Sequence, residues 1–153
     1  MKKEIGIVGL GKMGGNVARR LTKKGWHVVG FNRTASNTRE LEKEGIEGIY
    51  DLSEFTSKLS TPRVILLILT SGKPIDEVLK EVIKHLDPKD IIVEGANSFY
   101  KDTVRRGEEL NGRVHFMDIG TSGGPDGARN GACLMVGGDK KDWGLIGGTI
   151  EEG

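Results

Sequence analysis

The sequence predicts a single α/β domain with a doubly wound, mainly parallel sheet. Short apolar runs alternate with longer amphipathic segments along the 153 residues, in the order that strands and helices take in α/β proteins. A glycine-rich turn joins the first apolar run to the first amphipathic segment. The length suits one domain with a substantial core, so residues 1–153 are expected to fold as one unit.

The predicted strands are short apolar runs bounded by turn residues. The run 63–69 is the most apolar in the chain, and its length predicts a central buried strand. Residues 5–9 are also apolar enough to be buried on both faces of a parallel sheet. The predicted strands cover residues 5–9, 27–31, 48–50, 63–69, 91–93, 114–119 and 132–136. A second glycine-rich segment, at residues 120–131, is expected to be a loop.

The predicted helices are amphipathic segments with capping residues near their ends. The clearest covers residues 75–86, where apolar side chains recur at helical spacing after Pro74. A helix from Lys140 onward fits the charge pattern, although each of its glycines weakens it by about 1 kcal/mol relative to alanine. The other predicted helices cover residues 12–24, 34–43, 54–59 and 102–110.

The glycine-rich turn fits the pattern G-x-G-x-x-G of dinucleotide-binding proteins. Its residues are Gly9, Leu10, Gly11, Lys12, Met13 and Gly14. In that pattern the first glycine allows a tight turn, the second lets the backbone approach a pyrophosphate, and the third lets the helix pack close to the strand. The N-terminus of the helix then presents free N–H groups to the phosphates. The alternative is a glycine-rich turn that binds no ligand.

The end of the second predicted strand indicates which dinucleotide binds. NAD-binding domains usually place an acidic residue there to bond the ribose 2′-hydroxyl. This chain has Asn32, Arg33 and Thr34 instead, so no carboxylate repels a 2′-phosphate. The planar cation of Arg33 suits a phosphate and can stack on adenine. The prediction is therefore NADP over NAD; the alternative is that Arg33 is a surface arginine beside an NAD site.

Composition narrows the function classes. The 23 basic and 22 acidic residues nearly cancel, so net charge gives no support to nucleic-acid or membrane binding. The single cysteine, Cys133, forms neither an internal disulfide nor a C-x-x-C metal pair. We expect no metal, no signal peptide and no transmembrane span, and a cytoplasmic protein.

Several segments together resemble the 6-phosphogluconate dehydrogenase family, within the β-hydroxyacid dehydrogenase superfamily. The resemblance covers about residues 4–139, and its most specific parts are residues 94–103 and 118–138. It implies a Rossmann-type, NADP-binding N-terminal domain. The chain departs from the family pattern at Glu94 and Ala96, where the family usually has Asp and Gly, and at Thr70 and Ser71. A methyl group at Ala96 would cost stability if the backbone there needs a positive φ.

The resemblance also implies roles for individual residues. Asn97 would lie between the nicotinamide and the sugar acid 6-phosphogluconate. The other implied cofactor contacts are Gly9, Leu10, Gly11, Lys12, Met13, Gly14, Asn32, Arg33, Thr34, Leu69, Thr70 and Ser71. The other implied substrate contacts are Ser122, Gly123 and Gly124. In the intact enzyme the reaction would be oxidative decarboxylation to ribulose 5-phosphate in the pentose phosphate pathway.

No catalytic residue is assigned within this chain. The family carries its general base, its general acid and most of its dimer contacts on a helical domain, for which these 153 residues contain no counterpart. Lys73 and Lys101 are expected in loops without the burial that would tune a lysine for catalysis. We therefore expect the chain alone to bind NADP and to be inactive, and the intact enzyme to be a homodimer. The alternatives are a stand-alone NADP-binding regulatory module and a domain of another β-hydroxyacid dehydrogenase.

Overall fold

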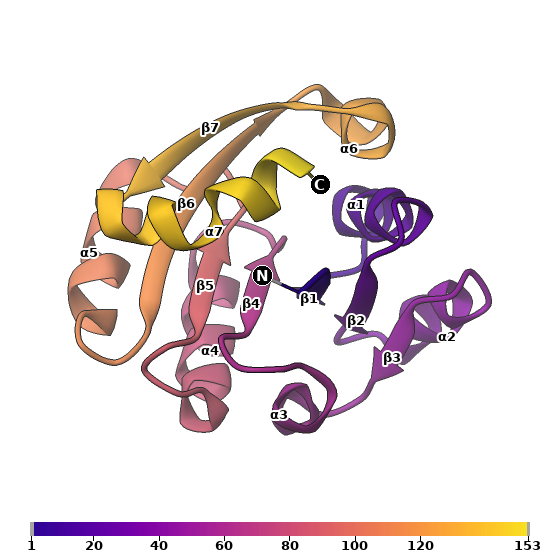
Figure 1. The fold of residues 1–153 in the computed structure, drawn as a ribbon, viewed down its shortest axis with the longest axis horizontal. Helices are drawn as coiled ribbons and strands as arrows, with labels where there is room; N and C mark the ends of the chain where they lie inside the picture. The colour runs from indigo at the N-terminus through magenta and orange to yellow at the C-terminus, as the bar shows by residue number, and fades with distance from the viewer. Residues whose placement is uncertain (1, 153) are drawn as a thin grey trace.

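The computed structural model describes residues 2–152 and contains a seven-stranded sheet in the order β3-β2-β1-β4-β5-β6-β7 (Figure 1). Strands β1 to β6 pair in parallel, and β7 is antiparallel to β6. The strands are β1 (Glu4–Val8), β2 (His27–Phe31), β3 (Glu47–Ile49), β4 (Val64–Leu67), β5 (Ile91–Glu94), β6 (His115–Ser122) and β7 (Cys133–Gly138). The predicted α/β fold with a mainly parallel sheet is confirmed.

Helices cover both faces of the sheet, as the doubly wound prediction requires. One core contains Ala18 and Leu21 of α1 with Ile146 of α7, and the other contains Phe55, at the start of α3, and Ile75 of α4. The helices are α1 (Lys12–Lys23), α2 (Ala35–Glu42), α3 (Phe55–Lys58), α4 (Lys73–Val82), α5 (Tyr100–Leu110), α6 (Gly124–Asn130) and α7 (Lys140–Glu152), with 3-10 turns η1 (Leu52–Glu54) and η2 (Ile83–His85).

The most apolar run forms a shorter strand than predicted. Only Val64–Leu67 of the run 63–69 lies in β4. The N–H of Ile68 still donates to the carbonyl of Val8 at 2.8 Å. Beyond that point both neighbouring strands have ended, β1 at Val8 and β5 at Glu94, so the chain has no strand to pair with and leaves the sheet.

The second glycine-rich segment is not the loop that the sequence predicts. Its first residues extend β6 to Ser122, because β7 returns antiparallel and pairs Ser122 with Cys133. The following residues form α6, which packs against α1, and the side-chain amide of Asn16 donates to the carbonyl of Pro125 at 3.0 Å. Contacts from distant parts of the chain therefore give this segment its regular structure.

The predicted C-terminal helix is confirmed as α7, which crosses in front of β5 and β6 in Figure 1. One of its glycines, Gly147, permits a close side-chain contact within the helix. A Cβ at Gly147 would lie 2.7 Å from the ring of Trp143, and neighbouring Ile146 is buried against the sheet. The packing of this face thus offsets the helix-weakening effect of glycine that the sequence shows.

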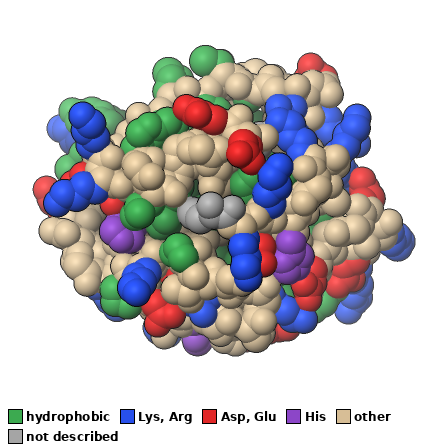
Figure 2. All heavy atoms as spheres, viewed as in Figure 1, with side chains coloured by type: hydrophobic (Ala, Val, Ile, Leu, Met, Phe, Trp, Pro, Cys, Tyr) green, Lys and Arg blue, Asp and Glu red, His purple; other side chains and the backbone are tan. Residues whose placement is uncertain are grey.

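The molecular surface carries mixed charges. Figure 2 shows basic and acidic side chains interspersed on one face, with apolar side chains gathered along the upper left, over β7. Leu134 and Met135 of β7 are exposed. Within residues 2–152, no helix combines the length and the apolarity needed to cross a membrane.

Candidate cofactor and substrate site

The predicted site residues all lie at the carboxyl ends of parallel strands. The chain leaves β1 toward β2 and β3 on one side, and then crosses to β4, β5 and β6 on the other, so the strand order reverses between β1 and β4. Ligands of open α/β sheets bind at such a point. The segments that meet at this edge are the glycine turn after β1, residues 32–34 after β2, residues 69–71 after β4, Asn97 after β5 and residues 122–124 at the end of β6.

The three glycines of the turn have distinct surroundings. Gly9 has φ +99°, and a Cβ there would collide with the carbonyl oxygen of Ile68. A Cβ at Gly14 would collide with the carbonyl oxygen of Gly9. A Cβ at Gly11 would meet no atom within 4 Å. Two glycines therefore allow close packing of strand, turn and helix, while the third leaves space where a ligand can approach the backbone.

The N-terminus of α1 is suited to an anion. Gly11 is the N-cap residue and makes no side-chain capping bond, and the first turn of α1 contains no acidic residue. The first N–H groups of this helix therefore have no side-chain acceptor, and the helix dipole places a partial positive charge beside them. These features fit a dinucleotide pyrophosphate.

Asn32 braces the glycine turn as well as standing at the predicted 2′-phosphate site. Its side-chain oxygen accepts a hydrogen bond from the N–H of Leu10 at 2.9 Å, and its amide nitrogen donates to the carbonyl of Thr34 at 3.1 Å. Both the side-chain oxygen and the side-chain nitrogen of Asn32 are therefore engaged by the protein. The sequence did not indicate this bracing role.

Arg33 is positioned to meet solvent or a ligand. It is exposed, and among residues 2–152 it forms no hydrogen bond or ion pair. The residues on either side of it, Asn32 and Thr34, are uncharged, so the end of β2 carries one free cation and no carboxylate. This arrangement suits a phosphate better than a ribose 2′-hydroxyl.

Asn97 joins the loop after β5 to β6. It has φ +51°, its side-chain oxygen accepts from the N–H of Thr121 at 2.9 Å, and its amide donates to the carbonyl of Thr121 at 3.2 Å. Ala96 does not have a positive φ, so its methyl group does not cause the backbone strain that a side chain causes at positive φ.

The predicted substrate residues form an exposed turn before α6. Gly123 has φ +130° and Gly124 has φ +60°, conformations that favour glycine. Ser122 is exposed at the end of β6. Because Asn16 of α1 bonds Pro125, this turn lies beside the helix that begins at the glycine turn. The structure thus brings the predicted cofactor and substrate segments to one edge of the sheet.

Neither lysine near the site is buried. Lys73 and Lys101 lie in the first turns of α4 and α5, so their expected placement in loops is wrong. The Lys73 side chain is 87% exposed and lies 3.8 Å from Glu77. Lys101 is also exposed. Without burial, neither ammonium has the environment that prepares a lysine to act as a general base.

The sequence reasoning missed a buried charge network behind the site. Arg106 of α5 is 1% exposed, and Glu94, at the end of β5, is completely buried. The Arg106 guanidinium donates to both Glu94 carboxylate oxygens at 3.2 Å and to Asp76 of α4 at 2.8 Å. The hydrogen bond from Arg106, with a second from Arg105, holds the pKa of Asp76 below its usual range. The sequence feature that could have indicated the burial of Arg106 is its spacing of i, i+4 from Leu110, which places both residues on one face of the helix.

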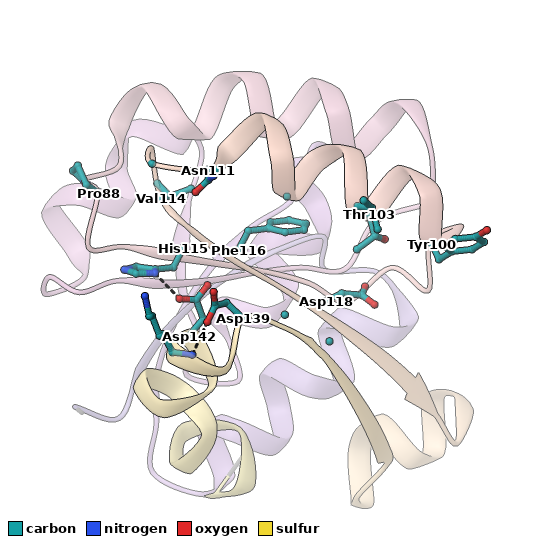
Figure 3. Close-up of a pocket in the computed structure, with 16 residues that line it drawn as sticks. Pro88, Tyr100, Thr103, Asn111, Val114, His115, Phe116, Asp118, Asp139 and Asp142 are labelled. Atoms are coloured by element: carbon teal, nitrogen blue, oxygen red, sulfur yellow. Dashed lines mark hydrogen bonds and ion pairs between the residues drawn. The ribbon is translucent and has the colours of Figure 1, made fainter.

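A second acid stands beside this network. Asp118 of β6 is in register with Glu94 of β5, and parallel strands place such side chains on the same face. Burial, together with the charge of Glu94, raises the pKa of Asp118. Asp118 also lines a cavity of about 680 Å³ between α5 and the β6–β7 edge (Figure 3).

That cavity is separate from the predicted site. Figure 3 shows Phe116 and Thr103 on one side of it, with His115 and Asp142 paired at its other end. The His115 ring nitrogen Nδ1 lies 2.7 Å from the Asp142 carboxylate, which fastens α7 to the start of β6. None of the predicted cofactor or substrate residues lines this cavity.

Comparisons with known proteins agree with the geometry. A family model described as the NAD binding domain of 6-phosphogluconate dehydrogenase matches residues 4–152. The NADP(+)-dependent, decarboxylating 6-phosphogluconate dehydrogenase of Bacillus subtilis (strain 168) is 38% identical over 155 residues, covering 98% of this chain and 33% of the relative. A decarboxylating 6-phosphogluconate dehydrogenase of Saccharomyces cerevisiae is 40% identical over 146 residues, covering 92% of this chain and 30% of the relative.

Solved structures show the same relationship. Plasmodium falciparum 6-phosphogluconate dehydrogenase, described in complexes with its cofactor NADP+ and its substrate 6-phosphogluconate, has a TM-score of 0.90 at 31% identity. That match covers 97% of this chain and 33% of the other. Mycobacterium tuberculosis 3-hydroxyisobutyrate dehydrogenase shares the fold, with a TM-score of 0.90 at 21% identity. The chain spans between 30% and 48% of the length of the similar relatives. It belongs to the family of NAD-binding domains of 6-phosphogluconate dehydrogenase.

Proposed function

We propose that this chain binds NADP and forms the cofactor half of an NADP-dependent 6-phosphogluconate dehydrogenase. The single observation that carries the choice of NADP is the end of β2, where exposed Arg33 has no partner among the described residues and no acidic residue follows the strand. The glycine turn and the N-terminus of α1 support binding of the pyrophosphate, because Gly11 leaves the backbone open.

Each part of the site would contribute binding or orientation. Gly9–Gly14 would hold the pyrophosphate, Asn32–Thr34 would contact the 2′-phosphate, and Leu69–Ser71 would lie along the cofactor toward its nicotinamide. The bound cofactor supplies the hydride acceptor. Asn97, fixed by its two bonds to Thr121, would stand between the nicotinamide and the substrate.

The substrate assignment rests on the relatives and on one turn of this chain. The relatives' names support 6-phosphogluconate, and oxidative decarboxylation to ribulose 5-phosphate, as the activity of the longer protein. Ser122, Gly123 and Gly124 would bind the acid end of that substrate through a hydroxyl and backbone N–H groups that glycine allows to turn toward an anion. The general base and acid would come from the part of the longer protein outside this chain. Cytoplasmic location, a role in the pentose phosphate pathway and homodimer formation complete the proposal.

Titration of the chain with NADP and with NAD tests the cofactor assignment. We expect NADP to bind more tightly, and Arg33→Asp to weaken NADP binding by about tenfold or more, because the 2′-phosphate loses its cation and gains a repelling carboxylate. Arg39→Asp, on the neighbouring helix α2, makes the same charge change outside the site and is the matched control. Unchanged NADP affinity in Arg33→Asp would contradict the assignment.

An assay of the longer protein separates the remaining alternatives. Formation of NADPH with 6-phosphogluconate supports the proposal. Turnover only with a smaller 3-hydroxy acid would favour another β-hydroxyacid dehydrogenase, whose fold this chain shares. NADP binding with no turnover of either acid would favour a regulatory module.

A further inference from the structure

We infer that Arg106 is a positioning residue for the nicotinamide end of the site, an assignment that rests on the proposed NADP-binding function. Arg106 belongs to α5, on the face of the sheet opposite α1, and its side chain is almost completely buried. From that face of the sheet, its guanidinium bonds to the loops after β4 and β5. Those two loops carry the residues that would flank the nicotinamide.

The contacts of Arg106 show how the two loops are joined. One guanidinium nitrogen donates to the carbonyl of Gly72 at 3.1 Å, and another donates to the hydroxyl of Ser98 at 3.2 Å. Gly72 directly follows Thr70 and Ser71, and Ser98 directly follows Asn97. The same planar group therefore fixes the backbone of one loop and a side chain of the other, so that a shift in either would break a bond to the rigid guanidinium.

Two carboxylates hold the guanidinium in place. Asp76, in the first turn of α4, accepts from Nε of Arg106, and Glu94 accepts at both oxygens. Gly72 is the N-cap residue of α4, has φ +93°, and as a glycine has no side chain that could cap the helix. The bonds from Arg106 to the Gly72 carbonyl and to the Ser98 hydroxyl connect that loop to its neighbour.

The neighbouring Arg105 provides a matched control. It also donates to Asp76, at 3.0 Å, but its other hydrogen bond is to Glu109 on its own helix, and among residues 2–152 it has no hydrogen bond to either loop. A variant at Arg105 therefore removes one bond to Asp76 and leaves both loops attached. Differences between the two variants report the loop contacts of Arg106 specifically.

The test compares two ligands on the 153-residue chain, NADP and 2′-phospho-ADP-ribose, which lacks the nicotinamide. In Arg106→Gln we expect NADP affinity to fall about tenfold, and the affinity of 2′-phospho-ADP-ribose to change by roughly twofold or less, because displacement of the loops affects only the nicotinamide end. Arg106→Lys should restore part of the loss. Arg105→Gln should bind both ligands like the unmodified chain.

Two further variants allow the proposal to be tested even if Arg106→Gln fails to fold. Glu94→Gln combined with Arg106→Gln removes both buried charges together, and Ser98→Ala removes only one loop contact. Both should retain the fold and still weaken NADP selectively. Equal weakening of the two ligands, or of neither, would overturn the positioning role. Failure of the unmodified chain to bind either ligand would instead overturn the proposed function.

Discussion

At the scale of single residues, the glycines of the turn after β1 have two different roles: some allow close packing, and one leaves space for a ligand. Gly9 and Gly14 are required by neighbouring backbone, since a side chain at either would collide with a carbonyl oxygen. Gly11 has open space above it and an ordinary φ of −74°. The same residue type therefore serves two purposes that can be distinguished by substitution.

Gly11→Ala should mainly affect NADP binding, whereas Gly14→Ala should mainly affect the stability of the fold. Gly11→Ala should lower the free energy of unfolding by about 1 kcal/mol or less, because alanine is a poorer N-cap residue than glycine, but should weaken NADP binding because its methyl group stands where the pyrophosphate approaches. Gly14→Ala should lower the free energy of unfolding by about 2 kcal/mol or more, because the methyl group collides with the backbone of Gly9. Urea unfolding and NADP titration measure the two effects.

Gly144→Ala is the control for both substitutions. A Cβ at Gly144 meets no atom within 4 Å, and the residue lies in α7, away from the turn. It should leave NADP affinity unchanged. If Gly11→Ala lost stability and kept NADP affinity, the open space at Gly11 would have no binding role.

At the scale of secondary structure elements, the register of β5 and β6 sets the electrostatics behind the site. It places Glu94 beside Asp118, while α4 and α5 bring Asp76 and Arg106 to the same region. Glu94 has the Arg106 guanidinium as its partner. Asp118 forms no hydrogen bond or ion pair within residues 2–152, and its pKa is raised by burial and by Glu94.

Asp118→Asn should therefore stabilise the protein at neutral pH. The pKa of Asp118 in the folded protein lies above its ordinary value of 3.8, so the folded state disfavours the ionised form. The increase in the free energy of unfolding that Asp118→Asn brings should be complete above the raised pKa. It should disappear as the pH falls below about 3.8, because Asp118 is then protonated in both the folded and the unfolded state. Urea unfolding at several pH values measures it.

Asp139→Asn is the matched control for this prediction. Asp139 is exposed, and its oxygen accepts from the N–H of Lys141, which an asparagine oxygen can also do. Because it removes a carboxylate at an exposed position, it should not stabilise the protein at neutral pH as Asp118→Asn does. A stabilisation by Asp118→Asn that persisted unchanged at acidic pH would mean that packing, and not charge, causes it.

At the scale of the whole molecule, several large apolar side chains are exposed on α5 and β7. The chain spans between 30% and 48% of the length of similar relatives. Phe99, Tyr100 and Val104, at the start of α5, are all more than half exposed, as is Met135 on β7. Exposed apolar side chains of this size mark interaction surfaces when they gather.

The isolated chain should therefore bind NADP without oxidising 6-phosphogluconate. Binding needs the loops at the carboxyl edge of the sheet, which this chain contains, whereas neither of its lysines near the site is buried enough to act as a general base. NADPH absorbance measures turnover, and the longer protein under the same conditions is the control. Turnover by the isolated chain at the rate of the longer protein would show that residues 1–153 contain the catalytic groups.

The sequence alone determined the order of the strands and of the helices other than α6, the glycine turn and the cation at the end of β2, because these depend on short-range periodicity and on neighbouring residue types. Only the tertiary structure showed that Asn32 braces Leu10, that Asn97 bonds Thr121 and that residues 124–130 form a helix. It also showed that Arg106 is buried between two acids. In each case the partner lies outside the short window that a local pattern covers, or the packing of several elements fixes the conformation. Burial of a charged side chain is favourable only when such partners meet it in the folded chain.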